Sequence, residues 1–441
     1  MEFFKHQNDL KTTWKLLRTV MQIEDKKVNQ ITLKINGLLV ENPETIANSF
    51  NNYFVTIASE LSNALPEYSG SFEEFLSPSR SNSMGCLLTS PEEILKISAS
   101  LKKTHSRGLD DIDPYLATPN INLITKPLSS IINCSLLNGI VPTKIKMAKV
   151  VPIFKKGDAE NPANYRPISV LPYFSKYFEK IVYDRLSNYI TEYGLIHQTQ
   201  HGFQKGHSTY MALIDMEDRI TKAIDANEFA VGIFIDLAKA FDTVDHTLLL
   251  KKLDNLGIRG PILKWFHSYL QERTQMVLCN DVLSEGREIM FGVPQGSNVS
   301  PLLFLIYIND LANISKNLYF ILFADDTNIF FAHHSWEILL QRLNNELTLV
   351  NNWFLANRLT LNIDKTNFIL FRSHRKPRVP VILPWRLLVF HYPKWSRQSS
   401  WELLSIVTCL GKTISIVLPK NYPKILALYI EFLTYSLNML N

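Results

Sequence analysis

The sequence predicts an α+β fold with a β-hairpin, a buried strand and helices, and three stretches carry that prediction. Phe320–Phe331 reads FILFADDTNIFF, with two apolar arms around an acidic pair, as expected of a β-hairpin with carboxylates at its tip. Val231–Ile235 is an apolar run typical of a buried strand. Trp336–Ala356 has apolar residues at helical spacing along one face.

The chain of 441 residues is long enough for two or three domains. Its 46% hydrophobic and 11% aromatic residues indicate a globular protein. The four cysteines lie far apart without a CxxC pair, so we expect reduced thiols and neither a zinc site nor a disulfide framework. The sequence shows no signal peptide and no apolar stretch long enough to span a membrane. We therefore expect an intracellular protein, nuclear or cytoplasmic or both, that is not secreted and has no membrane partner.

Basic residues gather in two zones of a chain whose formal net charge is only +5. Residues 141–190 hold nine Lys or Arg and four Asp or Glu, and residues 372–420 hold nine basic residues against one acidic residue. Such zones on a nearly neutral chain suit a polyanion that touches one side of the protein. Two solvated basic faces are the alternative.

Residues 1–90 are predicted to form a helical extension followed by a linker. Residues 1–65 are expected to be helical, with a helix start at Asn-Pro-Glu (42–44). Residues 66–89 are rich in Ser, Pro and Gly, as in a linker or exposed loop. Ser90 then caps a further helix.

Two basic segments follow. Lys102–Gly108 is a small-residue basic loop of a kind that can hold phosphates, although such loops are common. Further on, Lys155 ends an apolar strand, and Pro167 favours an extended conformation at Arg166. Lys155 and Arg166 are therefore expected to face each other across a hairpin, as a clamp suited to a triphosphate. Ser175–Ile190 is expected to be an amphipathic helix.

Gln198–Leu213 combines a Gly-rich loop with a helix start at Ser208. The loop contains His201 and His207, which lack the partner cluster of a metal site. We expect them to be solvated loop side chains.

A carboxylate follows the buried strand directly. Asp236 stands at the carboxyl end of that strand, where α/β sheets place their ligands, and Leu237–Phe241 is expected to be helical. Asp242 and Asp245 are expected to be helix-cap and surface residues.

The segments after residue 290 are predicted to form a loop, a helix and a strand. Phe291–Ser297 is a turn-rich loop that leads into an apolar helix over Pro301–Leu311. Asn367–Phe371 is expected to be a strand. Beyond Arg372 the pattern deteriorates, and only Leu403–Leu440 again has a helical pattern.

Asp236 and the pair Asp325–Asp326, which begins 89 residues further on, form the candidate catalytic constellation. Adjacent ionised carboxylates against an aromatic wall are costly unless a cation lies beside them. Mg²⁺ takes carboxylates together with substrate phosphates. Two such ions about 3.5–4 Å apart stabilise both the attacking and the leaving oxygen of a phosphoryl displacement. A solvated Asp-Asp turn is the alternative for the pair by itself.

Six segments, taken together, resemble the reverse transcriptases of non-LTR (LINE-type) retrotransposons, in particular the jockey-like elements. They occur in the family's order over about residues 100–372, with a looser match over 40–100. They are NYRPISVLPYFSKYFEK, HGFQKGHSTYMAL, FIDLAKAFDTVDH, GVPQGSNVSPLLFLIYINDL, LFADDTNIFF and LANRLTLNIDKTNFILF. The resemblance implies a right-hand polymerase with fingers over residues 91–230 and, over 231–372, a palm whose antiparallel sheet is backed by helices. A partial or degenerate helical thumb is implied over 373–441.

The resemblance also implies metal ligands. Asp236, Asp325 and Asp326 match the metal-binding triad of the palm, and the Leu237 carbonyl is expected to add a ligand. Two Mg²⁺ ions are the expected cofactors, with Mn²⁺ as an alternative ion.

Further matches concern the incoming nucleotide. Lys155 and Arg166 match the finger residues that hold its triphosphate, in agreement with the clamp. Phe241 matches the steric gate that lies under the sugar and excludes a 2′-hydroxyl, and Gln295 matches the residue that supports the nucleotide beside the primer. Lys365 resembles the lysine that protonates the pyrophosphate leaving group, for which a purely electrostatic role would look the same.

The chain departs from the family at several points. It reads PQGSNVSP where the family usually reads PQGSVLGP, so Asn298 and Ser300 are expected to alter loop packing without loss of activity. Residues 373–409 lack the family's short hairpin and resemble a scrambled, deleted or frameshifted segment. The family's endonuclease and zinc knuckle are not recognised, so we expect a truncated element that needs an endonuclease supplied by another protein.

The expected function is that of an RNA-directed DNA polymerase, with an RNA template, a DNA primer and dNTPs as partners. The alternative is a catalytically impaired remnant that binds nucleic acid through its basic zones. A polymerase of a related branch, such as an intron maturase, is a weaker alternative, because FADDT and LANRLTLN are jockey-like strings.

Overall fold

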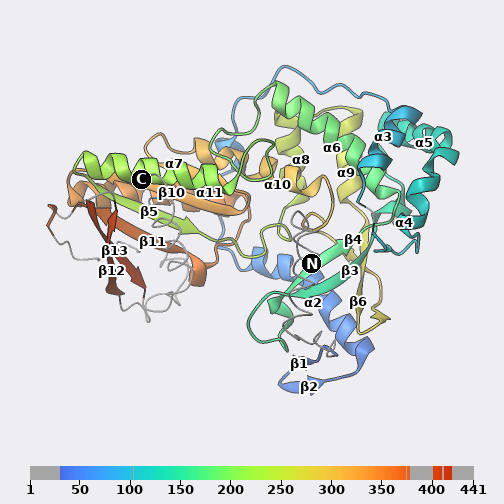
Figure 1. The fold of residues 1–441 in the computed structure, drawn as a ribbon, viewed down its shortest axis with the longest axis horizontal. Coiled ribbons are helices and arrows are strands. Elements are labelled where there is room, and N and C mark those ends of the chain that lie inside the picture. The colour runs from blue at the N-terminus through green and yellow to red at the C-terminus, as the bar shows by residue number, and fades with distance from the viewer. Residues whose placement is uncertain (1–29, 103, 374, 378–400, 410–411, 420–441) are drawn as a thin grey trace, which may run out of the picture.

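The computed structural model describes residues 30–102, 104–373, 375–377, 401–409 and 412–419, and the fold is given for these residues. Figure 1 shows two parts along the long axis of the molecule. One is a sheet covered by helices, and the other is a group of helices beside a second sheet. The helices expected for residues 1–29 lie outside the described residues.

The first sheet has four strands in the order β11-β5-β10-β9, and each neighbouring pair is antiparallel. The strands are β5 (Phe229–Ile235), β9 (Tyr319–Phe323), β10 (Asp326–His333) and β11 (Asn367–Arg372). The predicted buried strand, the predicted hairpin and the predicted strand after residue 366 are thus confirmed. They share one antiparallel sheet, as expected.

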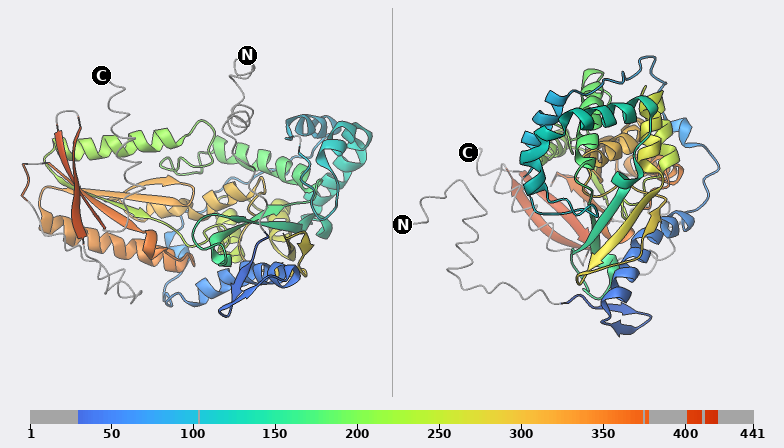
Figure 2. Two further views of the ribbon diagram at one scale, coloured as in Figure 1. Left: turned by 60° about the horizontal axis from the view of Figure 1, so that its bottom comes forward. Right: turned by 90° about the vertical axis from the view of Figure 1, so that its right-hand side faces the viewer.

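Helices cover both faces of this sheet, as the left view of Figure 2 shows. α7 (Thr209–Asp225) packs on one face and α11 (Trp336–Ala356) on the other. Because β5 is buried on both faces, its sequence is apolar throughout rather than alternating. Gly232 leaves room for the Phe330 ring, since a Cβ at this glycine would lie 2.9 Å from it.

The second sheet has the order β4-β3-β6-β7, and β8 also pairs with β6. β3 (Met147–Phe154) and β4 (Tyr165–Val170) form an antiparallel hairpin. β3 pairs in parallel with β6 (Arg273–Cys279), which is antiparallel to both β7 (Val282–Leu283) and β8 (Arg287–Ile289). Segments distant in sequence therefore build this sheet together.

The expected helix over residues 1–65 is wrong where the described chain begins. β1 (Leu33–Ile35) and β2 (Leu38–Val40) form a hairpin there. Its turn is an Asn-Gly pair, with φ of 51° at Asn36 and 84° at Gly37, and this pair favours a tight hairpin turn over a helix. α2 (Pro43–Asn63) then starts at the predicted Asn-Pro-Glu.

The predicted linker is a strap fixed to the surface. It contains η2 (Phe72–Phe75), whose Phe72 is buried, and it runs along the top of Figure 1. Arg80 N donates to Asn255 O at 3.0 Å, and Met84 N donates to Gly257 O at 2.9 Å. Although most of the strap is exposed, these bonds attach it to the end of a helix far along the chain.

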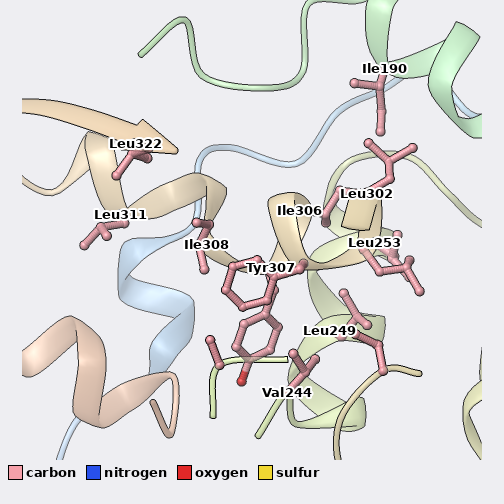
Figure 3. Close-up of a cluster of buried hydrophobic side chains, with 14 of the residues drawn as sticks. Ile190, Val244, Leu249, Leu253, Leu302, Ile306, Tyr307, Ile308, Leu311 and Leu322 are labelled. Atoms are coloured by element: carbon pink, nitrogen blue, oxygen red, sulfur yellow. The ribbon is translucent and has the colours of Figure 1, made fainter. Parts of the chain in front are cut away.

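The other described helices gather around an apolar core. Leu302, Ile306 and Tyr307 lie beside Leu249 and Leu253 in Figure 3. The helix that carries the first three is buried all round, which explains its continuous apolar sequence. The predicted helices Ser175–Ile190 and Pro301–Leu311 are confirmed, the second ending in a 3₁₀ turn.

The α-helices are α3 (Pro91–Ser100), α4 (Pro114–Ala117), α5 (Thr125–Asn138), α6 (Ser175–Glu192), α8 (His246–Asn255), α9 (Pro261–Leu270) and α10 (Ser300–Ile308). The 3₁₀ segments are η3 (Thr118–Leu123), η4 (Thr143–Lys146), η5 (Pro162–Asn164), η6 (Asn309–Asn313) and η7 (Ile363–Lys365).

The described carboxyl-terminal segments are strands, so the helix expected over Leu403–Leu440 is wrong for them. β12 (Trp401–Cys409) and β13 (Lys412–Pro419) form an antiparallel pair. Ile and Val are frequent in both, and β-branched residues favour strands. Residues 378–400, 410–411 and 420–441 lie outside the described part. The division into fingers, palm and thumb stays a prediction.

Over the described part of the chain, we find no helix with the length and apolar content needed to cross a bilayer.

Candidate active site

The tip of the predicted hairpin carries the acidic pair. Asp326 pairs with Phe323 across the turn, which leaves Ala324 and Asp325 as its two loop residues. Ala324 has a φ of 56°, in the left-handed region that residues with a Cβ rarely adopt. This tight turn places both carboxylates at the end of the sheet.

The strand register brings Asp236 to the same end. Ile235 pairs with Thr327 on one side of β5, so Asp236 comes level with Asp326 one step further on. On the other side, the register of β5 with β11 brings Lys365 level with Asp236. Lys365 Nζ lies 2.9 Å from Asp236 Oδ2, so the two candidate residues are in contact, while the role expected for Lys365 stays a prediction.

The backbone after Asp236 stays extended and pairs with residues 360–362, so the expected helix over Leu237–Phe241 is wrong. Asn362 N donates to Asp236 O at 2.8 Å, and Ala238 N donates to Thr360 O at 2.9 Å. These bonds hold the backbone extended around Leu237, and Lys239 then turns it with a φ of 53°. The Leu237 carbonyl takes no part in these two bonds, so its role as a ligand stays a prediction.

The carboxylates of Asp236, Asp325 and Asp326 repel one another at the hairpin tip. Burial and the neighbouring charge of Asp236 raise the pKa of Asp325. Burial, with the charges of Asp325 and Asp236, raises the pKa of Asp326 to about 6. The cations of Lys155 and Lys365 act in the opposite direction on Asp326. The three carboxylates therefore share one electrostatic site with nearby basic residues.

Lys155 and Arg166 lie on the β3–β4 hairpin as predicted. Arg166 pairs with Ile153, and Lys155 N donates to Asn164 O at 2.9 Å. Residues 153 and 155 point to the same face of an antiparallel hairpin, so Lys155 and Arg166 share that face. Burial and the charges of Arg166 and Lys365 lower the pKa of Lys155, as expected where cations crowd together.

A further cation, Lys239, was not predicted. Its Nζ donates to Ala163 O at 3.1 Å and to Tyr165 O at 3.3 Å, and it lies 5.4 Å from the centroid of the Tyr53 ring. Burial lowers the pKa of Lys239, and Lys155 is among the cations that lower it further. Lys239 thereby connects the segment after Asp236 with the β3–β4 hairpin. The sequence signal was a lysine three residues after a strand-end carboxylate.

Phe241 lies half-buried in a group of aromatic rings. It stacks on Phe304 of α10, with ring centroids 4.6 Å apart and an interplanar angle of 25°. Phe203 meets it edge-on at 6.2 Å, and Val293 N donates to Phe241 O at 2.9 Å. The ring is therefore fixed by packing from α10 and by the loop that precedes Gln295.

Gln295 is anchored on both sides. Its Nε2 donates to Asp242 Oδ1 at 2.7 Å, and its carbonyl accepts from Ser169 N at 2.7 Å. Asp242 is half-buried and bonded to Gln295, so the expected cap or freely solvated surface role does not describe it. Burial raises the pKa of Asp242 to about 6. Asp245 caps α8 as predicted, although it is buried.

The unusual Asn298 and Ser300 lie in a loop attached mainly through its backbone. Asn298 N donates to Oε2 of the buried Glu179 at 3.0 Å, while the Asn298 side chain is exposed. Ser300 is buried at the start of α10. The expectation that these residues leave activity intact stays a prediction.

His201 is buried, so the expected solvated loop histidine is wrong at this position. Its backbone pairs with β9, as His201 N donates to Leu322 O at 2.7 Å. Its ring lies 5.5 Å from that of the half-buried His207, and its Nε2 lies 3.9 Å from Asp215 Oδ2. Burial lowers the pKa of His201, which favours the neutral ring.

The basic loop at residues 102–108 carries its own counter-ions. Arg107 lies 3.4 Å from Asp111 and 3.2 Å from Asp113. These contacts neutralise the arginine locally, and Lys103 lies outside the described residues. The structure therefore adds no support for a phosphate site there.

The three predicted carboxylates suit Mg²⁺ by their chemistry. Among the described residues, no group of three His, Cys, Asp or Glu side chains is arranged to hold a metal ion as it stands, and Asp236 instead engages Lys365. Carboxylate oxygens are nevertheless the hard ligands that Mg²⁺ prefers. Burial and then neighbouring carboxylates raise the pKa of Asp325 and of Asp326, and a cation would relieve the repulsion between the carboxylates.

Carboxylates at the end of an antiparallel sheet, near cations from a hairpin of a second sheet, agree with the right-hand polymerase expected from the sequence. The chain belongs to the reverse transcriptase (RNA-dependent DNA polymerase) family, whose model matches residues 153–416. The predicted resemblance to jockey-like non-LTR elements is confirmed by the relatives that the chain matches.

Two of these relatives are from Drosophila melanogaster. A probable RNA-directed DNA polymerase from transposon BS is 30% identical over 372 residues, which is 80% of this chain and 40% of the relative. The RNA-directed DNA polymerase from the mobile element jockey is 27% identical over 361 residues, 80% of this chain and 39% of that protein. The chain thus spans about two fifths of the length of these relatives.

Among solved structures, a Candida tropicalis telomerase in complex with a fragment of telomeric RNA matches with a TM-score of 0.40 and 13% identity. The match covers 58% of this chain and 47% of that one.

Proposed function

We propose that the chain is an RNA-directed DNA polymerase that extends a primer 3′-hydroxyl along an RNA template with dNTPs. The observation that carries the proposal is the convergence of Asp236 with Asp325 and Asp326 at one end of a sheet, beside Lys155 and Lys365. Family membership supports the same reaction.

Asp236, Asp325 and Asp326 would hold two Mg²⁺ ions, with Mn²⁺ as an alternative and the Leu237 carbonyl as an added ligand. When bound, the ions would stabilise the attacking and leaving oxygens of the displacement. Lys155 and Arg166 would bind the triphosphate from the β3–β4 hairpin, because both side chains lie on the same face of that hairpin. Lys239 would keep this hairpin in place through the carbonyls of residues 163 and 165.

Three further residues would orient the nucleotide and move its protons. Phe241, fixed by its stacking on Phe304, would lie under the sugar and exclude a 2′-hydroxyl. Gln295, held by Asp242, would support the nucleotide beside the primer. Lys365 would exchange its contact with Asp236 for a phosphate oxygen and donate a proton to the pyrophosphate.

Primer extension tests the proposal. The substrates are oligo(dT) on poly(rA), with dTTP and Mg²⁺, and the comparison is wild type against Asp236→Ala. Asp218→Ala is the matched control, because Asp218 is an exposed carboxylate on α7. We expect incorporation by wild type and by Asp218→Ala but not by Asp236→Ala. Wild type that binds the hybrid yet incorporates no more dTTP than Asp236→Ala would support the nucleic-acid-binding remnant instead.

A further inference from the structure

The acidic turn is held by a segment outside its own hairpin. Leu322 N donates to Thr199 O at 2.9 Å, and His201 N donates to Leu322 O at 2.7 Å. Gln200 forms a parallel bridge with Leu322 between these two bonds. Residues 199–201 therefore lie along β9 as a short additional strand, and they end beside the turn that carries Asp325.

The Gln200 side chain reaches the turn itself. Its Oε1 accepts from Ala324 N at 3.0 Å and from Gly202 N at 2.8 Å. Two backbone donors on one atom fix which end of the amide is the oxygen. Gln200 is 2% exposed, so these bonds form away from water, where losing the acceptor leaves buried N–H groups unpaired.

Gly202 brings this segment close to the turn. A Cβ added at Gly202 would lie 2.2 Å from Ala324 N, a distance that real side chains do not reach. The approach therefore requires glycine at this position. Ala324 is the residue of the turn with a left-handed backbone conformation, which is unfavourable for a residue with a Cβ. Gln200 and Gly202 both contact the backbone of this residue.

We propose that Gln200 is a positioning residue for polymerisation: its amide oxygen holds Ala324 in the left-handed conformation and thereby aims the Asp325 carboxylate. Asp325 follows Ala324 directly, so a rotation of the turn would displace that carboxylate. The catalytic part of this inference rests on the proposed function, whereas the structural part does not. Gly202 supports the same conformation by allowing the close approach.

Hydrogen exchange tests the structural part without any need for activity. Gln200→Met keeps the length of the side chain but removes the acceptor, and Gln198→Met is the control because Gln198 is exposed in the same segment. We expect the Ala324 amide to exchange about tenfold faster in Gln200→Met and at the wild-type rate in Gln198→Met. Unchanged exchange at Ala324 in Gln200→Met would overturn the inference.

Metal dependence of primer extension tests the catalytic part. We expect Gln200→Met to lower kcat and to raise the Mg²⁺ concentration for half-maximal rate by about tenfold, with KM for dTTP nearly unchanged. Gly202→Ala should change both quantities in the same direction, because its Cβ would displace Ala324. A reduced folded fraction alone lowers kcat but leaves the Mg²⁺ dependence unchanged, and that result would contradict a positioning role. If wild type is no more active than Asp236→Ala, the proposed function fails, while the exchange result still decides the structural part.

Discussion

At the residue scale, the carboxylates of the hairpin tip oppose folding as long as no cation neutralises them. The pKa of Asp326 rises from 3.8 in the unfolded reference to about 6 in the folded chain, chiefly because of burial and then because of Asp325 and Asp236. The folded state therefore binds the extra proton between these two values. The stabilisation that this extra proton provides to the folded state is present at low pH and is lost as the pH rises through about 4 to 6.

We accordingly expect Asp326→Asn to raise the melting temperature at about pH 8, with the gain almost lost near about pH 3, which is below the pKa of Asp326 in both states. Thermal melts without Mg²⁺ at the two pH values measure this effect. Asp218→Asn, at an exposed site on α7, is the control and should show no such pH dependence. A gain of equal size at both pH values would show that charge is not its cause.

The proposed gate at Phe241 can be tested by nucleotide selection. Because its ring is fixed against Phe304, truncation should open space under the sugar without another side chain being free to fill it. We expect Phe241→Ala to reduce the preference for dTTP over rUTP by about tenfold or more. Competition kinetics give the ratio, and Phe75→Ala is the control, as Phe75 is half-buried in the remote strap. An unchanged ratio would remove Phe241 from the gate role.

How far single residues could be predicted depended on where their partners lie. Asp236 and the Asp325–Asp326 pair were found because each interrupts an apolar run that is visible in the sequence. Lys239 was missed because its partners are backbone carbonyls at residues 163 and 165, which no side-chain pattern reveals. His201 was placed in solvent because its pairing with Leu322 of β9 is a long-range bridge.

At the scale of elements, a buried ion pair joins α8, η6 and α11. Lys252 Nζ lies 2.9 Å from Asp310 Oδ1, which also accepts from Trp353 Nε1 at 3.1 Å. Both charged side chains are almost fully buried. Removal of one partner leaves an uncompensated buried charge, whereas an apolar pair of similar volume would leave none.

We therefore expect Asp310→Ala to reduce the free energy of unfolding by about 3–5 kcal/mol. The double variant Lys252→Met with Asp310→Leu should recover most of that loss. Urea denaturation provides the measurement. Lys251→Met is the matched control, because its pair with Glu73 is exposed and should contribute about 1 kcal/mol or less. A double variant less stable than Asp310→Ala would contradict this account.

Helices were predicted well where the spacing of apolar residues extended over several turns. Elements were predicted poorly where a turn or a long-range backbone bond determined the conformation. α11 was predicted to the residue because its apolar stripe runs over its full length. β1 and β2 were missed because their Asn-Gly turn stands within a segment taken as helical. The helix expected over Leu237–Phe241 failed because bonds to residues 360 and 362 keep the chain extended after Asp236.

At the scale of the whole molecule, the candidate site depends on how the two sheets are held together. The carboxylates come from the β5–β10 pair, whereas Lys155 and Arg166 come from the β3–β4 hairpin of the other sheet. Lys239, which follows β5, donates from its Nζ to Ala163 O and Tyr165 O of this hairpin, and Ser169 N of β4 donates to Gln295 O of the loop before α10 at 2.7 Å. The position of the proposed triphosphate clamp relative to the carboxylates is thus set partly by Lys239, which belongs to neither group.

Lys239→Met tests this connection. The substitution keeps most of the side-chain volume but removes the donor, so the β3–β4 hairpin should lose its attachment while both sheets stay folded. We expect KM for dTTP to rise about tenfold, because Lys155 and Arg166 would no longer be held at the distance that the triphosphate needs. Lys222→Met on α7 is the control, since its pair with Asp218 is exposed and does not contact the β3–β4 hairpin. A Lys239→Arg variant keeps a donor and should retain a lower KM than Lys239→Met. If KM is unchanged in Lys239→Met while the melting temperature falls, Lys239 serves only stability and does not position the proposed clamp.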